Sequence, residues 1–344
     1  MENLIAVVFS FILALLISFG ATPIVKKFAH RIGAIDVPKD DRRMHKEPIP
    51  RLGGLAIFFG FLFSFLIFGN ITIQMKSVVL GSVIIVILGI IDDIIPLSAK
   101  LKFVIQIIAA GIPVMMGGLR IERFTNFLPF SSDPYIDLGV LSIPVTIILI
   151  VGITNAVNLI DGLDGLAVGI STISAFTMLA ISFILNLPQI GIMMAALSGA
   201  CVGFMPYNFN PAKIFMGDTG STFLGYILAT ASIMGLFKYY AIISFAVPFL
   251  ILGLPIFDTG FAMVRRILNG QSPMQADRGH VHHKLIDMGF SQKQTVAILY
   301  SISGVLGLSA VVLASSGELK AILTIVTVVI CGYVGKKIME IGDI

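Results

Sequence analysis

Long hydrophobic runs separated by short polar segments follow one another along the whole chain. Eleven runs can be distinguished, and runs of this length suit helices that cross the hydrocarbon core of a bilayer. They cover residues 4–25, 52–69, 77–91, 103–117, 140–153, 166–185, 190–205, 222–237, 241–264, 295–314 and 321–335. The pattern predicts an all-α polytopic membrane protein with about eleven transmembrane helices, built as a single integral membrane domain over residues 1–344.

The composition supports this interpretation. Hydrophobic residues make up 57% of the chain and charged residues 12%, which lies outside the range of soluble globular domains. The first run lacks a basic leader and is followed by Lys26 and Lys27, so we expect a retained span rather than a cleaved signal peptide. Cys201 and Cys331 both lie inside apolar runs and indicate neither a disulfide framework nor a metal site.

The charges predict the orientation in the membrane. If the N-terminus is outside, 18 of the 23 Lys and Arg residues lie in segments assigned to the inside, as cytoplasmic loops require. The C-terminus is then cytoplasmic, and the histidines and most clustered aspartates fall on the same side. We therefore expect a multi-pass membrane protein whose polar clusters converge on the cytoplasmic face. Outside, segment 118–139 alternates in polarity and predicts a small β-hairpin.

Two adjacent carboxylates, Asp92 and Asp93, end the third run. Neighbouring carboxylates repel each other unless a cation lies beside them, so the pair suits Mg²⁺ coordination or base catalysis. A solvated helix terminus is the alternative for an isolated pair, but further polar clusters on the same side favour a site.

Segment 155–167 interrupts two apolar runs with four polar residues at intervals of three: Asn155, Asn158, Asp161 and Asp164. On a straight helix each step of three turns the side chain back by about 60°, so the four cannot share one face. Gly162 and Gly165 predict a bend that solves this problem. A capped turn between helices is the alternative, with Asp164 as N-cap, but it gives the asparagines no purpose.

A third cluster, in segment 206–222, places Asp218 between glycines just before a new helix. Free backbone N–H groups at a helix start favour an anion, and Asp218 could hold a metal that bridges to it. Phe215 is a candidate to stack on a base, although a buried or interfacial aromatic is an equally good interpretation.

The fourth cluster, in segment 265–285, contains Arg278, His280, His282 and His283. The spacing matches no common zinc pattern and no Cys is near, so a cationic phosphate clamp is the better interpretation. Just upstream, Pro248 and Pro255 predict a bend in the ninth run that opens a lipid-facing groove. In the first cytoplasmic loop, His45 and Arg51 flank a Pro-containing turn, where the basic residues could also serve only to set topology.

Five ordered motifs resemble those of the polyprenyl-phosphate N-acetylhexosamine-1-phosphate transferases. They are H-K-E-P-I-P-R-L-G-G, I-I-D-D, N-A-V-N-L-I-D-G-L-D-G-L-A, F-M-G-D-T-G-S and D-R-G-H-V-H-H-K-L. Within that superfamily the chain is similar to the branch that moves GlcNAc-1-phosphate from UDP-GlcNAc to undecaprenyl phosphate, which starts wall teichoic acid or related envelope polymers. The phospho-MurNAc-pentapeptide transferases of peptidoglycan synthesis are the alternative, but they usually carry a different motif in place of P-I-P-R-L-G-G.

The resemblance also implies roles for individual residues. Asp218 and Asp93 would hold Mg²⁺, which Mn²⁺ could replace, and Asp92 would act as a base toward the lipid phosphate, giving Asp92, Asp93 and Asp218 as catalytic residues. The expected substrate-binding residues are His45, Arg51, Asn155, Asn158, Asp161, Asp164, Phe215, Arg278, His280, His282 and His283. The expected partners are a UDP-N-acetylhexosamine, undecaprenyl phosphate, the bilayer and a second copy in a homodimer, with no nucleic acid.

A secondary transporter would also have about eleven spans and helices broken by proline. Transporters place substrate and coupling residues near the middle of the bilayer. Here only Asp258 lies inside an apolar run, and it lies toward the cytoplasmic end. Polar motifs gathered on one face therefore favour an enzyme at the membrane surface, and they also disfavour a scaffold without catalysis.

Overall fold

The computed structural model describes residues 2–38, 47–125, 135–235, 246–271 and 279–315, and this part of the chain is mostly helical. The helices are α1 (Glu2–Ile32), α2 (Gly54–Phe68), α3 (Ile73–Ile94), α4 (Ala99–Met115), α5 (Ser142–Leu159), α6 (Leu166–Ile184), α7 (Pro188–Asn208), α8 (Gly217–Gly235), α9 (Ala246–Ile251), α10 (Gly253–Leu268), α11 (Val281–Asp287) and α12 (Gln292–Ser315). Strands β1 (Ile35–Asp36) and β2 (Ile49–Pro50) form one antiparallel pair, and β3 (Arg123–Thr125) and β4 (Tyr135–Asp137) form another.

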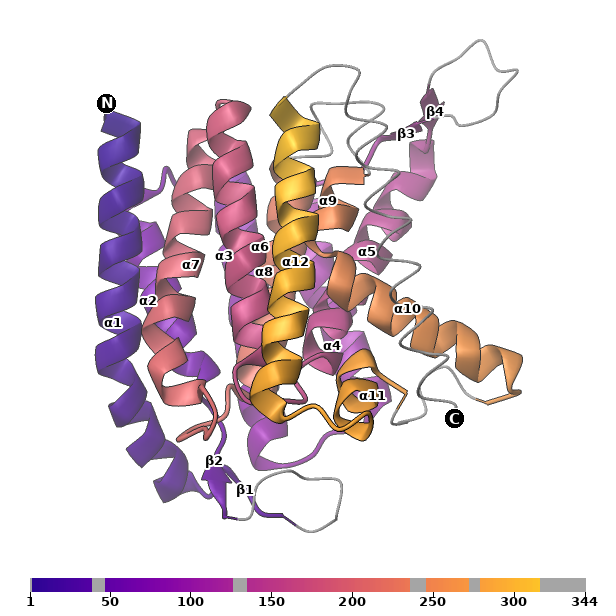
Figure 1. Ribbon diagram of the computed structural model, residues 1–344. Helices are drawn as coiled ribbons and strands as arrows, with labels where there is room; N and C mark the ends of the chain where they lie inside the picture. Colours follow the sequence, from indigo (N-terminus) through magenta and orange to yellow (C-terminus); the bar gives the residue numbers. More distant parts are fainter. Residues whose placement is uncertain (1, 39–46, 126–134, 236–245, 272–278, 316–344) are drawn as a thin grey trace.

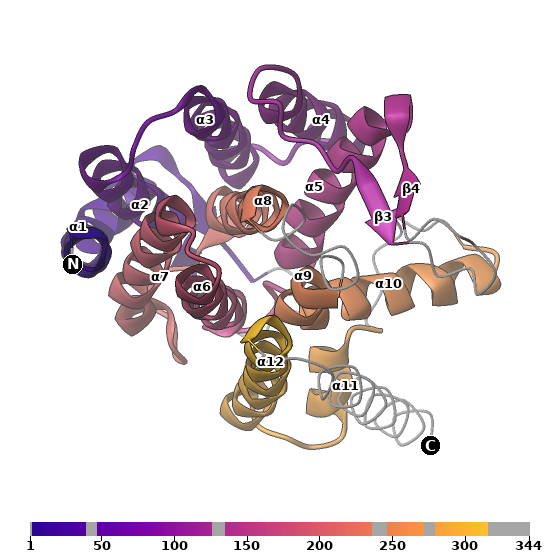
Figure 2. The same cartoon turned by 90° about the horizontal axis from the view of Figure 1, so that it is seen from above.

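Helix α8 is the centre of the bundle. Seen along the bundle axis, α2, α3, α5, α6 and α7 surround it (Figure 2). All of its residues are buried except Asp218, which stands at its first turn. The first turn of α8, with Asp218, therefore begins a helix that its neighbours pack against from several sides.

Six helices of the described part are long and apolar enough to cross a membrane. They span Asn3–Ile32, Ile73–Ile94, Gly139–Leu159, Leu166–Ile184, Pro188–Asn208 and Gln292–Ser315, and α2 is a shorter apolar helix. The chain is thus a helical protein with several candidate membrane spans, whereas the expected count of about eleven is not confirmed. One reason is that the apolar run 321–335 lies outside the described residues.

The expected bend in the ninth run is confirmed. The run is divided at Leu252 into the short helix α9 and the longer α10, which points outward from the bundle (Figure 1). Pro248 and Pro255 flank the break, as expected for residues that cannot donate a backbone hydrogen bond in a helix interior. The lipid-facing groove stays a prediction.

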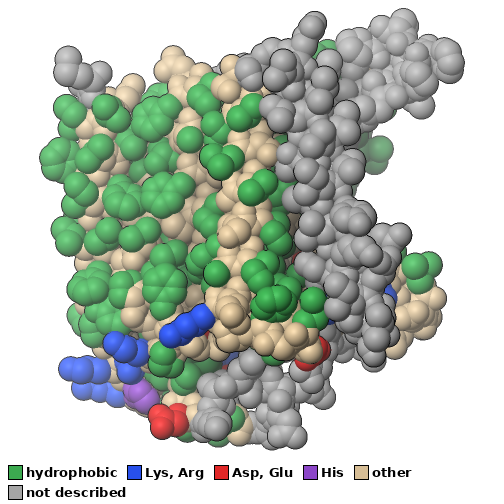
Figure 3. Space-filling view, viewed as in Figure 1, with side chains coloured by type: hydrophobic (Ala, Val, Ile, Leu, Met, Phe, Trp, Pro, Cys, Tyr) green, Lys and Arg blue, Asp and Glu red, His purple; other side chains and the backbone are tan. Residues whose placement is uncertain are grey.

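Polar and hydrophobic groups are segregated between the ends and the sides of the molecule. Strands β1 and β2 and helix α11 lie at one end, and the predicted hairpin of β3 and β4 lies at the other (Figure 1). Figure 3 shows hydrophobic side chains over the outer face of the helices and Lys and Arg side chains at the end that holds β1 and β2. This arrangement suits a membrane protein, while the assignment of one end to the cytoplasm stays a prediction.

Candidate active site

The loop before α8 is fixed to the segment that leads into α2. Phe215 donates its N–H to Pro50 O at 2.9 Å, and Phe215 O accepts the N–H of Gly53 at 2.9 Å. Met216 O in turn accepts the N–H of Gly54 at 2.9 Å. These backbone bonds place the P-I-P-R-L-G-G and F-M-G-D-T-G-S motifs side by side, although they are more than 150 residues apart in the chain.

Asp93 caps the start of α8 from the neighbouring helix α3. Its Oδ1 accepts the N–H of Asp218 at 3.0 Å, and its Oδ2 accepts the N–H and the hydroxyl of Thr219 at 3.0 and 2.7 Å. Gly217 makes this approach possible, because it has a φ of +72° and a Cβ atom there would lie 2.4 Å from Asp93 Oδ2. Both carboxylate oxygens of Asp93 are therefore engaged in holding Asp218 in place.

Asp218 is surrounded by cationic and amide groups. Lys102 of α4 donates from Nζ to Asp218 Oδ2 and to Asp92 Oδ2, at 2.9 Å each. Asp218 Oδ1 accepts the Asn158 amide at 3.2 Å and lies 3.8 Å from Arg51 Nη2. The second oxygen of Asp92 accepts the N–H of Leu97 at 2.7 Å. The aspartates thus meet one ammonium group and one guanidinium group, and sequence reasoning had not singled out Lys102.

The polar residues of segment 155–167 do not all reach the same place. Asn155 pairs with Gln106 of α4, donating to Gln106 Oε1 at 2.6 Å, and lies apart from the cavity described below. Asn158, one turn later, reaches Asp218 and also Ser221 Oγ at 2.8 Å. The expectation that no straight helix could aim all four residues at one ligand therefore agrees with their placement.

Asp161 lies beyond the end of α5, in the loop that lines the cavity. Burial, together with the negative charge of Asp218, raises the pKa of its carboxyl group to about 7. A bound cation would relieve this cost by stabilising the ionised carboxylate.

Asp164 holds the α7–α8 loop rather than capping α6. Its Oδ2 accepts the Asn210 amide at 2.9 Å and the N–H of Ala212 at 3.0 Å. The N-cap position of α6 belongs to Gly165, which has a φ of +79° and so makes the predicted bend. Asn208 Oδ1 accepts the N–H of Gly165 at 3.1 Å, and the Tyr300 hydroxyl of α12 donates to Gly165 O.

The histidine segment packs against this bend. The ring of His282 is buried and its Nε2 lies beside Gly162, where a Cβ atom would be only 2.4 Å away. Burial, together with the neighbouring His283, lowers the pKa of His282 to about 3, so the imidazole is neutral at ordinary pH. His283 lines the cavity and His280 pairs with Asp258. His45 and Arg278, also expected in the site, lie outside the described residues.

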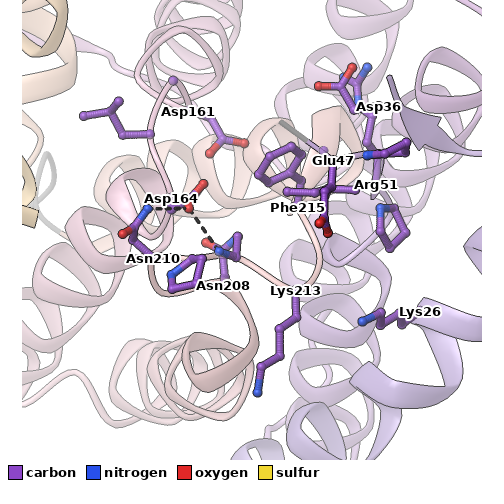
Figure 4. A pocket seen from close by; sticks show the side chains of 18 of the residues that line it. Lys26, Asp36, Glu47, Arg51, Asp161, Asp164, Asn208, Asn210, Lys213 and Phe215 are labelled. Carbon is purple, nitrogen blue, oxygen red and sulfur yellow. Dashed lines mark hydrogen bonds between the residues drawn. The ribbon is translucent and has the colours of Figure 1, made fainter. Parts of the chain in front are cut away.

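A cavity of about 960 Å³ opens between these elements, and its size suits a nucleotide sugar. Figure 4 shows Asp161, Asp164 and Asn210 on one side of the cavity and Arg51, Phe215 and Glu47 on the other. Lys26 and Lys213 lie in the lower part of the same view. Of the expected site residues, the lining includes Arg51, Asn158, Asp161, Asp164, Phe215, Asp218 and His283. The lining does not include five other expected residues, Asp92, Asp93, Asn155, His280 and His282. Two of these five are nevertheless close to Asp218, because Asp92 shares the ammonium group of Lys102 with it and Asp93 accepts its N–H.

The residues around Asp218 fit a magnesium ion in a limited way. Within the described residues, no group of three or more His, Cys, Asp or Glu side chains is arranged to hold a metal. Mg²⁺, however, is often bound by one or two carboxylates together with substrate phosphates. Asp92 and Asp218 supply two such oxygens, which already converge on the ammonium group of Lys102. Asp93 fits less well, because its oxygens hold the start of α8.

Comparison with known proteins agrees with the motifs. Residues 75–236 match the family described as Glycosyl transferase family 4. The chain is 44% identical over 92% of its length to a Bacillus subtilis (strain 168) protein named "Probable undecaprenyl-phosphate N-acetylglucosaminyl 1-phosphate transferase", of which 87% is covered. It is 35% identical to a Mycolicibacterium smegmatis protein named "Decaprenyl-phosphate N-acetylglucosaminephosphotransferase", over 86% of this chain and 79% of the relative.

A third relative carries a different activity in its name. It is a Staphylococcus aureus (strain bovine RF122 / ET3-1) protein named "Phospho-N-acetylmuramoyl-pentapeptide-transferase", 33% identical over 86% of this chain and 97% of the relative. All three relatives are transferases and are similar over most of their length, and the matched region holds Asp92, Asp93 and Asp218. The chain is therefore a member of glycosyl transferase family 4.

Proposed function

We propose that the chain transfers GlcNAc-1-phosphate from UDP-GlcNAc to undecaprenyl phosphate, releasing UMP and forming undecaprenyl-pyrophosphate-GlcNAc. The observation that carries this proposal is the 44% identity over 92% of the chain to a relative named for that reaction. The relative named for phospho-MurNAc-pentapeptide transfer is 33% identical, which favours the GlcNAc branch. The product would be the first lipid-linked intermediate of a cell-envelope glycopolymer such as teichoic acid.

The charges of the site support this chemistry. An oxygen of the lipid phosphate would form a bond to the sugar-bearing phosphorus of UDP-GlcNAc, and the bond from that phosphorus to the UMP oxygen would break. Both substrates are anionic, so the new bond forms only if their charges are neutralised. Lys102 and Arg51 supply two positive charges within 4 Å of Asp218. Mg²⁺, held by Asp218 and Asp92, would add further neutralisation when bound.

The lipid phosphate needs little help from a base. The second pKa of a phosphate monoester is about 6, so the group is already mostly dianionic at neutral pH. Asp92 also accepts hydrogen bonds from Lys102 Nζ at 2.9 Å and from the Leu97 N–H at 2.7 Å, so both of its oxygens already have partners. We therefore assign Asp92 to the cation and the lipid phosphate rather than to an obligatory proton transfer.

The remaining polar groups of the cavity would hold the nucleotide sugar. Phe215 presents a ring for stacking on the base, and Asn158 and Asp161 offer an amide and a carboxyl group beside Asp218. Asp164 would act by fixing the α7–α8 loop, and His283 lies at the cavity wall. His45 and Arg278 remain candidates for substrate contact.

The proposal places the reaction at the cytoplasmic face of a bacterial plasma membrane. The excess of Lys and Arg in the segments around the site supports this orientation, with the N-terminus outside. A homodimer, expected from the family resemblance, stays a prediction that light scattering of the purified protein in detergent would test.

Purified protein supplied with undecaprenyl phosphate, Mg²⁺ and UDP-GlcNAc should release UMP, and UDP-MurNAc-pentapeptide in the same assay should release little. A clear preference for the pentapeptide substrate would move the chain to the other branch, and no UMP from any UDP-N-acetylhexosamine would refute the proposal. Asp218→Asn should abolish UMP release while the protein stays folded. Asp137→Asn is the matched control, because Asp137 is exposed in the β3–β4 hairpin and far from the cavity.

A further inference from the structure

Asp258 is the one carboxylate inside an apolar run whose purpose the proposed reaction does not explain. It lies on α10, six residues beyond the break at Leu252, and only 6% of its surface is exposed. A buried carboxylate is costly unless hydrogen bonds or an opposite charge compensate for it. The hydrogen-bond partners of Asp258 therefore indicate its role.

Both oxygens of Asp258 are bound to the start of the histidine helix α11. Oδ1 accepts the N–H of Val281 at 2.8 Å, and Oδ2 lies 2.8 Å from Nδ1 of His280. Val281 is the first residue of α11, so its N–H has no partner within that helix. An ionised carboxylate only accepts hydrogen bonds, so pairing with such a group requires a His280 ring that carries a proton on Nδ1.

A second residue of α10 holds the same segment. Arg265 lies seven positions after Asp258, which is two helical turns and the same face of α10. It donates from Nη1 to Gly279 O at 3.0 Å. Side chains of α10 thus contact three successive residues, 279, 280 and 281. These contacts fix the start of α11 relative to α10.

The three histidine rings form a continuous row of contacts from Asp258 to the cavity. The centroids of His280 and His282 are 5.8 Å apart with nearly parallel planes, and those of His282 and His283 are 4.3 Å apart. His282 touches Gly162 at the predicted bend, and His283 lines the cavity. A change at His280 would therefore move both His283 and the loop that carries Asp161.

We propose that Asp258 is a positioning residue that fixes the Nδ1 proton of His280 and sets the histidine row against the nucleotide-sugar cavity. The proposal rests on the assignment of that cavity to UDP-GlcNAc. Asp258 does not line the cavity and acts through His280 and the N-terminus of α11. In metal sites, replacing a partner that orients a ligating histidine through its second ring nitrogen costs about 10–100-fold in affinity or activity, and we expect an effect at the lower end of that range here.

The test compares Asp258→Asn with Thr259→Val in the full-length protein in detergent. Asn has the size of Asp and keeps an oxygen for the Val281 N–H, but its NH₂ group cannot accept the His280 proton. We expect the KM for UDP-GlcNAc to rise about 10-fold or more, with the KM for undecaprenyl phosphate and the kcat changing less than about 3-fold. Thr259 is the matched neighbour on α10, since its buried hydroxyl has no hydrogen-bond partner within the described residues, and Thr259→Val should keep both KM values.

A spectroscopic measurement tests the bond without turnover. In wild-type protein labelled with ring ¹⁵N-histidine, the signal that disappears in His280→Gln should show a protonated Nδ1. A proton only on Nε2 would overturn the proposal, and this result stands even if Asp258→Asn does not fold. An unchanged KM for UDP-GlcNAc in folded Asp258→Asn, or an equal rise in Thr259→Val, would also overturn it. Wild-type protein that turns over no UDP-sugar would refute the proposed function instead, while the ¹⁵N signal would still decide whether the Asp258–His280 bond exists.

Discussion

Replacing Asp93 by Asn should destabilise the protein, and the contacts of Asp93 give the size of the effect. Its side chain is fully buried and accepts three hydrogen bonds at the start of α8, with Arg51 Nη2 at 3.3 Å from Oδ1. Asn keeps only one acceptor oxygen and places an NH₂ group against an N–H or hydroxyl donor of Asp218 or Thr219. It also removes the negative charge that faces Arg51. Breaking a buried charge pair by removing one partner costs about 3–5 kcal/mol.

Thermal unfolding in detergent measures this loss. A change of 1 kcal/mol shifts the Tm of a large domain by about 2 °C, so Asp93→Asn should lower the Tm by about 6–10 °C. Asp137→Asn is the matched control. Asp137 also pairs with an arginine, Arg123, but their side chains are 70% and 63% exposed, so the change should cost less than about 1 kcal/mol.

The same assay separates the two roles that Asp93 could have. If Asp93 caps α8, the drop in Tm has the same size with Mg²⁺ and with a chelator, because the lost bonds are within the protein. If Asp93 is instead a metal ligand, as the family resemblance implies, wild-type protein gains stability from Mg²⁺ and Asp93→Asn loses that gain. A Tm of Asp93→Asn that equals wild type in the chelator would refute the capping argument.

Three further changes test other parts of the site. Lys102→Met leaves Asp92 and Asp218 without their shared ammonium group and should lower UMP release at least about 100-fold, while Lys76→Met, an exposed lysine of α3, should stay within about 2-fold. Gly162→Ala puts a Cβ atom 2.4 Å from His282 Nε2 and should cost about 1–3 kcal/mol in unfolding free energy, whereas Gly152→Ala meets open space and should be neutral or slightly stabilising by thermal unfolding. The pKa of His282 is about 3 when folded and about 6.5 when unfolded, so only the unfolded chain takes up a proton between these values. The contribution of His282 to stability should therefore be full above pH 6.5 and fall by up to about 1.4 kcal/mol per pH unit as the pH drops toward 3. In His282→Phe, which lacks this group, the Tm should fall less than in wild type over the same pH range. An equal fall in Tm for both proteins would contradict this.

The sequence was sufficient to predict the helical membrane fold, the broken ninth run and the β3–β4 hairpin. Each of these depends on local properties, namely hydrophobic runs, prolines and alternation of polarity. The number of spans was harder to predict, because a run such as that of α8 is buried by its neighbours rather than by lipid. In the amino-acid sequence, an apolar run that packs inside a bundle looks similar to one that faces lipid.

The contacts of individual candidate site residues were less predictable than the fold. Lys102 lies among ordinary basic residues in the sequence, and only the packing of α3 and α4 brings it between Asp92 and Asp218. Asn155 and Asn158 look equivalent, yet one turn of helix directs Asn155 to Gln106 and Asn158 to Asp218. A carboxylate can bind a metal or cap a helix, and which of these it does depends on neighbours that are distant in the chain.

The central position of α8 has a consequence for how the protein is assembled in the membrane. Within the described residues, α8 is not among the six helices that are long and apolar enough to cross a membrane. Hydroxyl groups on Ser221, Thr222, Thr230 and Ser232 donate to carbonyl oxygens one turn earlier, so the helix satisfies its own polar groups. The neighbouring helices bury every residue of α8 except Asp218, so we expect the position of α8 to depend on them. We therefore expect the start of α8, and with it Asp218, to become ordered only once α2, α3, α5, α6 and α7 have packed around it.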